Sequence, residues 1–173
     1  MMDVGARERI LTAAELRART GGYNGFSFRD LAEDVGVKSS SVHYHFPTKA
    51  ELGEALARRY AERARARLGD AAALAPEAAV ARVVALFRDA LLVDDRMCLC
   101  GLLGAEHDAL PPAVAAAVAD FFRLVLDFLS AACGASWRGS SPSSLLARLE
   151  GGLILSRSLR DNRLFEAIAA EIV

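Results

Sequence analysis

Apolar residues recur at intervals of three and four along almost the whole chain of 173 residues. One such series is Val80, Val83, Val84, Phe87 and Leu91. A helix brings residues with this spacing onto one face, whereas a half-buried strand needs alternation with a period of two, which we do not find. We therefore expect an all-α protein, and 53% hydrophobic residues are ample for a core.

Glycine, proline and capping residues divide the chain into about nine expected helices. The first contains Ile10 and ends at Gly21-Gly22, and the next three cover roughly residues 28–35, 39–46 and 48–68. A fifth begins at Pro76 and a sixth covers about 98–108. The last three are expected between Val114 and Gly134, from Pro142 through Arg160, and over 163–172.

Two capping sequences and one glycine define a short unit near the N-terminus. Ser27-Phe28-Arg29-Asp30 and Thr48-Lys49-Ala50-Glu51 each match the capping box that begins a helix. Between them, the small Ala32 would let two helices cross closely and Gly36 can adopt the left-handed conformation that ends a helix. With Val42 as an apolar anchor, this spacing predicts a helix-turn-helix.

The second helix of this unit has an outward face suited to a DNA groove. With Val42 and Phe46 facing the core, Ser40 and Tyr44 point outward. Short hydroxyl side chains let a helix backbone approach the major groove, and longer side chains reach bases or phosphates. The alternative is a structural helical hairpin with a solvated polar face.

Other polar residues surround this face. Ser41 and His43 fall on its flanks, and Lys38 and Lys49 stand at the two ends of the element. A lysine at either end could hold a phosphate and thereby fix the register of the helix on DNA.

Three segments closely resemble the N-terminal domain of the TetR family of transcriptional regulators. They are RERILTAA (7–14), GYNGFSFRDLA (22–32) and GVKSSSVHYHFPTK (36–49), and the similarity continues without a gap to about Leu56. The resemblance implies a homodimeric repressor without cofactor or catalytic site. Its DNA-binding domain would be residues 1–48, followed by a helical ligand-binding and dimerisation domain at 49–173, with helix 49–68 connecting the two.

The resemblance also implies which residues contact a palindromic DNA operator. The second helix of the helix-turn-helix would be the recognition helix, and its contacts would come from Ser40, Ser41, His43, Tyr44 and His45. Lys49 would bind a phosphate, and Ser27 and Arg29 would contact phosphates from the start of the preceding helix. The full predicted interface is Ser27, Arg29, Lys38, Ser39, Ser40, Ser41, His43, Tyr44, His45 and Lys49. Two features depart from the family: His43 replaces a usual tyrosine, and Arg17-Ala18 replace larger apolar residues in the first helix.

The family pattern places a small-molecule site among the fifth to eighth helices. The expected lining is Phe87, Leu91, Cys98, Leu102, His107, Phe121 and Val125. This mostly apolar set suggests a small apolar or aromatic ligand. A second hypothesis is a repressor that senses electrophiles or oxidants through Cys98 or Cys100, since a reactive thiol needs access and a lowered pKa. The competing interpretation is that these cysteines are small core residues.

The same resemblance places dimerisation on the last two helices, as a four-helix bundle across a twofold axis. The predicted interface residues are Leu149, Gly152, Leu153, Ser156, Phe165 and Ile168. Small residues at Gly152 and Ser156 would let a partner helix approach. The alternative is that these side chains form a core within one chain.

Charge and hydropathy indicate where in the cell the protein is expected. The total charge is −1, but residues 1–67 carry a net charge of +3 and residues 68–173 a net charge of −4. The longest stretch without a charge, 109–119, has 11 residues, too few to span a membrane. The opening MMDVGARERI has no apolar segment of the signal-peptide type, so we expect a cytoplasmic protein that does not bind membranes.

Other classes of site find little support in the sequence. Cys98 and Cys100, like His43 and His45, are two positions apart and point about 200° apart on a helix, so neither pair can close on one metal ion. The C-terminal part has a single polar cluster, at 106–108. Adjacent helical residues point in different directions, which argues against a catalytic constellation. A small helical enzyme or a protein-interaction domain is the alternative from another class.

Overall fold

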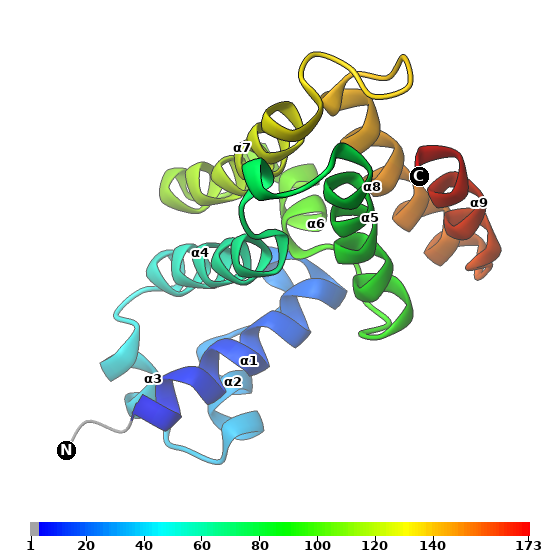
Figure 1. Ribbon diagram of the computed structural model, residues 1–173. Helices are drawn as coiled ribbons and strands as arrows, with labels where there is room; N and C mark the ends of the chain where they lie inside the picture. Colours follow the sequence, from blue (N-terminus) through cyan, green and yellow to red (C-terminus); the bar gives the residue numbers. More distant parts are fainter. Residues whose placement is uncertain (1–3) are drawn as a thin grey trace. The chain divides into compact units, whose positions relative to one another are not determined.

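The computed structural model describes residues 4–173, which form nine α-helices and three short 3₁₀ helices (η) without a β-strand (Figure 1). The bounds are α1 Val4–Gly21, η1 Tyr23–Gly25, α2 Phe28–Val35, α3 Ser39–His45, α4 Lys49–Leu68, η2 Ala71–Ala73, α5 Pro76–Leu92, α6 Leu99–Ala105, η3 His107–Ala109, α7 Pro112–Cys133, α8 Pro142–Leu159 and α9 Arg163–Ile172. The predicted all-α fold with nine helices is confirmed. Among the described residues, none of the helices is long and apolar enough to cross a membrane.

The chain forms two compact units. Unit 1 comprises residues 1–60 and 99–119, and unit 2 comprises residues 61–98 and 120–173. The division therefore falls within α4 and within α7. The first part of α4, α6 and the start of α7 group with α1, α2 and α3 in unit 1.

The core of unit 1 is built on α1, whose Ile10, Leu11 and Ala14 are fully buried. Helix α1 packs against α2, α3 and α6, and α2 packs against α3 (Figure 1). Val42 on α3 is fully buried. This apolar side chain therefore anchors the short helix in the core, as predicted. Ala18 is also fully buried, so the small residue fits the core at this position of α1.

The turn between α2 and α3 has the predicted capping groups. The Ser27 hydroxyl accepts a hydrogen bond from the Asp30 amide at 3.2 Å, and the Asp30 carboxylate accepts one from the Ser27 amide at 3.0 Å. Gly36 has φ 71°, and its amide donates to the carbonyls of Ala32 and Glu33. This left-handed residue satisfies the last carbonyls of α2 and directs the chain into α3.

The core of unit 2 contains the apolar series of α5, all of which is buried, together with α8 and α9. Helices α8 and α9 pack side by side (Figure 1). A Cβ at Gly152 would lie 3.2 Å from the Phe165 ring and 3.3 Å from Ile168, so glycine permits this close packing. The indole of Trp137 donates a hydrogen bond to the Ile172 carbonyl at 2.8 Å and anchors the loop between α7 and α8.

Two helices differ from their expected bounds. Helix α1 begins at Val4, before the first apolar position that the periodicity detects. Helix α6 ends at Ala105, and residues 107–109 form a separate 3₁₀ turn. The cluster at 106–108 is therefore not part of one continuous helix.

Candidate DNA-binding interface

Helix α3 presents a hydrogen-bonding surface around an apolar anchor. Val42 and Phe46 are buried, whereas Ser39, Ser40 and His43 are exposed and Tyr44 has 70% of its surface exposed. Ser41 and His45 are half-buried. The arrangement agrees with the helical wheel: the side chains predicted to face outward do so, and the two apolar residues point into unit 1.

The aromatic residues of α3 are partly oriented by neighbouring rings. The His43 ring lies 4.6 Å from the Phe28 ring of α2, edge to face, and Tyr44 has a similar contact with His45 at 5.3 Å. Edge-to-face contacts restrict a ring without covering its polar atoms. His43 therefore packs along α2, and Tyr44 is the aromatic side chain that extends furthest into solvent.

Lys49 differs from the other basic residues of the predicted interface. Its ammonium lies 4.8 Å from the centroid of the Tyr23 ring and 4.7 Å from that of Phe26. Partial burial lowers the pKa of Lys49, while the nearby carboxylates of Asp30 and Glu106 act in the opposite direction. This lysine is thus held by a cation–π contact at the start of α4, and a phosphate would have to approach it there.

Three further predicted residues, Ser27, Arg29 and Lys38, are exposed. The Ser27 hydroxyl donates to the Asp30 carboxylate at 2.7 Å, so it already serves as a helix cap. These hydrogen bonds lower the pKa of Asp30. Among residues 4–173, Arg29 and Lys38 have no ion pair or side-chain hydrogen bond, so both cations are available to an anionic partner.

The guanidinium of Arg7 lies beside the end of α3, a feature the sequence analysis did not identify. Its central carbon is 5.0 Å from the centroid of the Phe46 ring, and the side chain is exposed. The stacking holds a positive charge of α1 next to the C-terminal end of the recognition helix.

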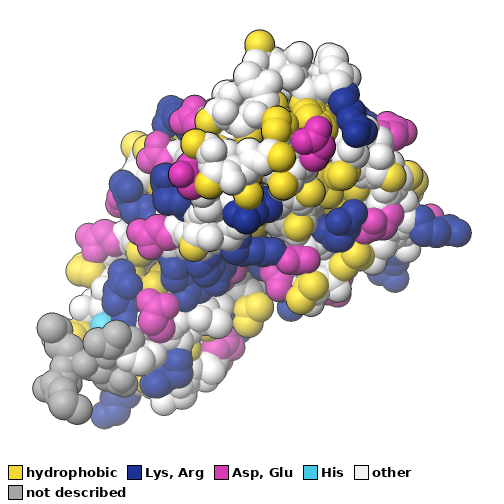
Figure 2. Space-filling model, viewed as in Figure 1, with side chains coloured by type: hydrophobic (Ala, Val, Ile, Leu, Met, Phe, Trp, Pro, Cys, Tyr) yellow, Lys and Arg dark blue, Asp and Glu magenta, His cyan; other side chains and the backbone are white. Residues whose placement is uncertain are grey.

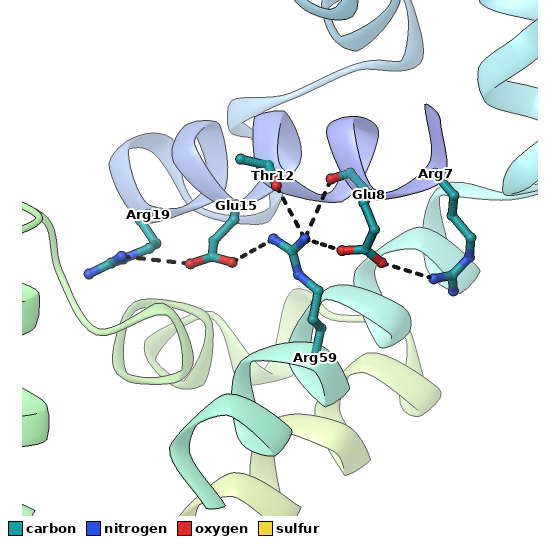
Figure 3. A network of polar contacts seen from close by, with 6 residues as sticks. All are labelled: Arg7, Glu8, Thr12, Glu15, Arg19 and Arg59. Carbon is teal, nitrogen blue, oxygen red and sulfur yellow. Dashed lines mark hydrogen bonds and ion pairs between the residues drawn. The ribbon is translucent and has the colours of Figure 1, made fainter. Parts of the chain in front are cut away.

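A network of ion pairs joins α1 to α4 (Figure 3). Arg59 of α4 donates to the Glu8 carboxylate at 3.0 Å, to the Thr12 hydroxyl at 3.2 Å and to the Glu15 carboxylate at 2.9 Å. Glu15 also lies 3.7 Å from Arg19, and both of these side chains are buried, with 6% and 5% of their surfaces exposed. Arg59 therefore fixes the middle of α4 against α1, the helix on which α2 and α3 pack.

A second ion pair holds α1 to α2. Arg17 binds both carboxylate oxygens of Asp34 in a fork, with one of the two bonds at 2.9 Å. Hydrogen bonding to Arg17 lowers the pKa of Asp34. Arg17 thus contributes a polar contact between α1 and α2 instead of core packing.

Glu106 makes a contact that depends on a glycine. Its carboxylate accepts a hydrogen bond from the Tyr23 amide at 2.8 Å. Gly22 has φ 68°, and a Cβ at this residue would lie 1.9 Å from a Glu106 oxygen. The carboxylate can approach the end of α1 only because Gly22 has no side chain. Sequence reasoning assigned no role to Glu106, and the adjacent glycines before Tyr23 were the only signal.

The predicted ligand-lining residues divide between the two units. Five of them are buried in unit 2, namely Phe87, Leu91, Cys98, Phe121 and Val125. Leu102 and His107 belong to unit 1, and His107 is exposed in η3. The structure therefore buries five of the predicted lining residues in unit 2 and leaves His107 exposed in unit 1.

The cysteines occupy interior positions. Cys98 and Cys100 are buried, and Cys133 is half-buried. Burial raises the pKa of Cys133, which disfavours its thiolate. These positions agree with the core interpretation of the cysteines. Within the described part of the chain, no group of three or more metal-ligating side chains is found.

The predicted dimer residues mostly pack within one chain. Leu149, Gly152, Leu153, Ser156 and Phe165 are buried. The Ser156 hydroxyl accepts a hydrogen bond from the Phe165 amide at 3.0 Å. The small residues that suggested a partner helix therefore accommodate α9 of the same chain, which is the alternative that the sequence left open. The exposed face of α8 carries other residues.

Comparison with known proteins agrees with this architecture. Residues 10–56 match the family described as bacterial regulatory proteins, tetR family. A TetR transcriptional regulator from Legionella pneumophila is 30% identical over 99% of this chain and 97% of that chain, with a TM-score of 0.83. A TetR-family regulator from Agrobacterium tumefaciens is 26% identical over 96% and 95% of the two chains, with a TM-score of 0.87. No curated protein matches the sequence.

The family match covers α2 and α3 and extends into α1 and α4, which are the elements that build the exposed surface of α3. The similarity to the Legionella pneumophila regulator extends beyond this region to nearly the whole chain. Members of this family are DNA-binding regulators, not enzymes. The chain belongs to the TetR family of bacterial transcriptional regulators.

Proposed function

We propose that this protein is a cytoplasmic repressor that binds a palindromic operator as a homodimer and is released by a small ligand bound in unit 2. The observation that carries the DNA-binding part is the division of α3, in which Val42 and Phe46 are buried while Ser40 and Tyr44 are exposed. Such a helix contributes little to the core beyond its anchors. Its outer residues are available for base contacts in a major groove.

The positive groups around α3 support the proposal. Arg29 and Lys38 are exposed and form no ion pair with any described residue, and the Arg7 guanidinium lies beside Phe46. Guanidinium and ammonium groups contact phosphates and position a recognition helix without reading sequence. Arg7 is added here to the predicted set as a phosphate contact, because of its place next to α3.

A homodimer would use the outer face of α8 and α9. Ile154, Leu155 and Leu159 are exposed, and a Cβ at Gly151 would meet no atom. Figure 2 shows apolar side chains interspersed with charged ones over the part of the surface that contains α8 and α9. An apolar helix face with an open glycine suits the close approach of a twofold-related helix. Two recognition helices about 34 Å apart would then reach successive major grooves.

The effector would bind in the interior of unit 2. The buried set of Phe87, Leu91, Phe121 and Val125 supports a ligand with an apolar or aromatic body. Because α4 contributes residues to both units, a ligand that prefers one arrangement of unit 2 could act on α1 through Arg59. The ligand would shift the equilibrium only by its difference in affinity for the two states.

The test of DNA binding is a Ser40→Ala, Tyr44→Ala double variant. Each lost base contact is worth about 1–3 kcal/mol, so operator affinity should fall about 100-fold or more in a mobility-shift assay. Ser130→Ala, which removes an exposed hydroxyl in unit 2, should have no effect. Wild-type binding should weaken steeply with salt, as phosphate contacts require. Undiminished sequence-specific binding by the double variant would refute the proposed interface.

The dimer surface has its own test. Leu155→Glu places a charge at the centre of the exposed α8 face and should shift the protein to monomer in sedimentation analysis. Leu16→Glu, an exposed leucine of α1, is the matched control and should remain dimeric. A dimeric Leu155→Glu variant would place the interface elsewhere.

A further inference from the structure

Unit 2 contains a carboxylic acid that the proposed apolar ligand does not explain. Glu150 lies on α8, and both of its carboxyl oxygens are buried. Among the described residues no N–H or O–H group donates to them, and the thiol of Cys98 is their one weak donor. Buried polar atoms nearly always have a partner in folded proteins, because an unsatisfied one costs free energy. The position therefore needs an explanation beyond folding.

The surroundings of Glu150 are apolar on its own helix. Leu146 and Leu153, one turn before and after it, are buried. A leucine or methionine at this position would continue the apolar seam. The acid is thus the exception in a sequence that otherwise places hydrophobic residues on this side of α8.

The connection between α5 and α6 supplies the nearby polar groups. Asp95 accepts a hydrogen bond from Arg157 of α8 at 2.9 Å, which holds this connection along α8. A hydrogen bond from the Cys98 thiol acts to lower the pKa of Glu150, against the effect of burial, but a thiol is only a weak donor. Arg96, on the same connection, does not pair with Glu150, and its own Nε atom is buried without a partner among residues 4–173.

The ionisation of Glu150 agrees with this environment. Burial raises its pKa to about 7, against an ordinary value of 4.5. Protonation removes the charge but leaves a hydroxyl and a carbonyl that still need partners. A positively charged N–H donor would satisfy both oxygens and stabilise the carboxylate.

We propose that Glu150 anchors an effector that carries an ammonium or amidinium group on an apolar body. This inference rests on the proposed function, in which unit 2 binds the effector, and it changes the expected ligand from a neutral apolar compound to an organic cation. The buried aromatic and aliphatic residues of unit 2 would contact the body, and the Glu150 carboxylate would accept hydrogen bonds from the nitrogen. Neutral analogues would leave Glu150 unsatisfied.

The direct test compares primary arylalkyl and alkyl ammonium ions with the alcohols of the same carbon skeleton, beginning with 2-phenylethylammonium and 2-phenylethanol. Binding to the full-length protein is measured by calorimetry at pH 7, without DNA. We expect at least one ammonium ion to bind tenfold or more tightly than its alcohol. A series in which no ammonium ion exceeds its alcohol would overturn the proposal.

Glu150→Gln assigns the effect to this side chain. The ratio of ammonium to alcohol affinity should fall close to one in Glu150→Gln. It should remain at the wild-type value in Glu171→Gln, which removes an exposed carboxylate of α9. An unchanged ratio in Glu150→Gln would show that another group holds the cation.

Proton release gives a test that needs no variant. Because the cation requires the carboxylate form, its binding near pH 7 should release about half a proton from a group whose pKa is about 7. Calorimetry in two buffers of different ionisation enthalpy measures this release, and the alcohol should release none. A cation that binds without releasing protons is not bound to Glu150.

A mobility-shift assay separates this inference from the proposed function. An ammonium ion that binds through Glu150 but does not release operator DNA would support the anchor and refute effector-controlled release. Specific operator binding by a protein that shows no preference for cations would support the DNA-binding part of the proposed function and refute the Glu150 anchor.

Discussion

Two glutamates with buried carboxyl groups, one in each unit, have opposite surroundings. In unit 1, Glu15 is surrounded by guanidinium groups, with Arg59 at 2.9 Å and Arg19 at 3.7 Å. In unit 2, Glu150 has two buried oxygens and, among the described residues, only the weak thiol donor of Cys98 beside them. The first arrangement satisfies a charge within the fold, and the second leaves a polar group available.

The difference follows the tasks proposed for the two units. A DNA-binding unit must keep its recognition helix in one orientation. The ion pairs between α1 and α4 restrict the relative movement of these two helices. An effector site must instead retain unsatisfied groups, because a group already paired within the chain offers little to a ligand. A structural acid and a ligand-binding acid should therefore differ in how protein stability responds to loss of a partner and to pH.

The largest effect is expected from removing the partner of Glu15. Arg59→Met would leave the carboxylates of Glu8 and Glu15 without their shared donor. Breaking a buried pair from one side costs about 3–5 kcal/mol. The free energy of unfolding, measured with urea and helical circular dichroism, should fall by an amount in this range.

Arg58→Met is the control for that measurement. Arg58 is the adjacent residue on α4 and its side chain is 57% exposed. Among residues 4–173 it pairs with Glu54 alone, four residues earlier. An exposed pair of this kind is worth under about 1 kcal/mol. If Arg58→Met were as destabilising as Arg59→Met, the network in Figure 3 would not have the structural role that we assign to it.

The second prediction concerns the stability of the ligand-free protein against pH. The pKa of Glu150 is about 7 in the folded protein and 4.5 ordinarily, so folding favours its protonated form. Its contribution is fully present below about pH 4.5 and is lost as the pH rises through 7. The shift of about 2.5 units corresponds to a loss of roughly 3 kcal/mol between pH 5 and pH 8.

Glu150→Gln should remove most of this pH dependence, because an amide does not ionise. At pH 8 the variant should therefore unfold at a higher temperature than the wild type, which is the reverse of the Arg59→Met effect. The carboxylates whose pKa is lowered, Asp30, Asp34 and Asp161, affect stability only at lower pH. A Glu150→Gln variant that keeps the full pH dependence would assign it to another group.

Much of the fold was predictable because local signals agree with packing. The caps at Ser27 and Gly36 and the apolar spacing at Val42 each act within a few residues, so the α2–α3 unit was fully described by the sequence. The start of α1 was missed because Val4 precedes the first apolar pair. The end of α6 was missed because no glycine or proline separates Ala105 from the 3₁₀ turn.

The sites were less predictable because they depend on which groups meet in space. Gly152 and Ser156 have the spacing of a helix-packing face, but spacing does not say whether the facing helix comes from the same chain. The role of Arg59 depends on partners more than forty residues away. Glu150 gave no signal either, since an acid beside apolar residues on a helix usually reaches solvent.

The smallest effect is expected at Glu106. In its number of hydrogen-bond partners this carboxylate lies between Glu15 and Glu150, because it accepts one hydrogen bond, from the Tyr23 amide. Gly22→Ala would introduce a Cβ 1.9 Å from the Glu106 carboxylate and would require φ 68° from alanine, so the Tyr23 contact should be lost. A left-handed alanine alone costs about 1–2 kcal/mol. Gly21→Ala is the matched control, because nothing lies within 4 Å of the Cβ that alanine would add and the φ of Gly21 is not in the left-handed range. Since alanine favours a helix more than glycine does, the stability of this variant should be unchanged or slightly raised. Urea unfolding of the two variants measures the difference, and equal stabilities would mean that the Glu106 contact adds nothing to the end of α1.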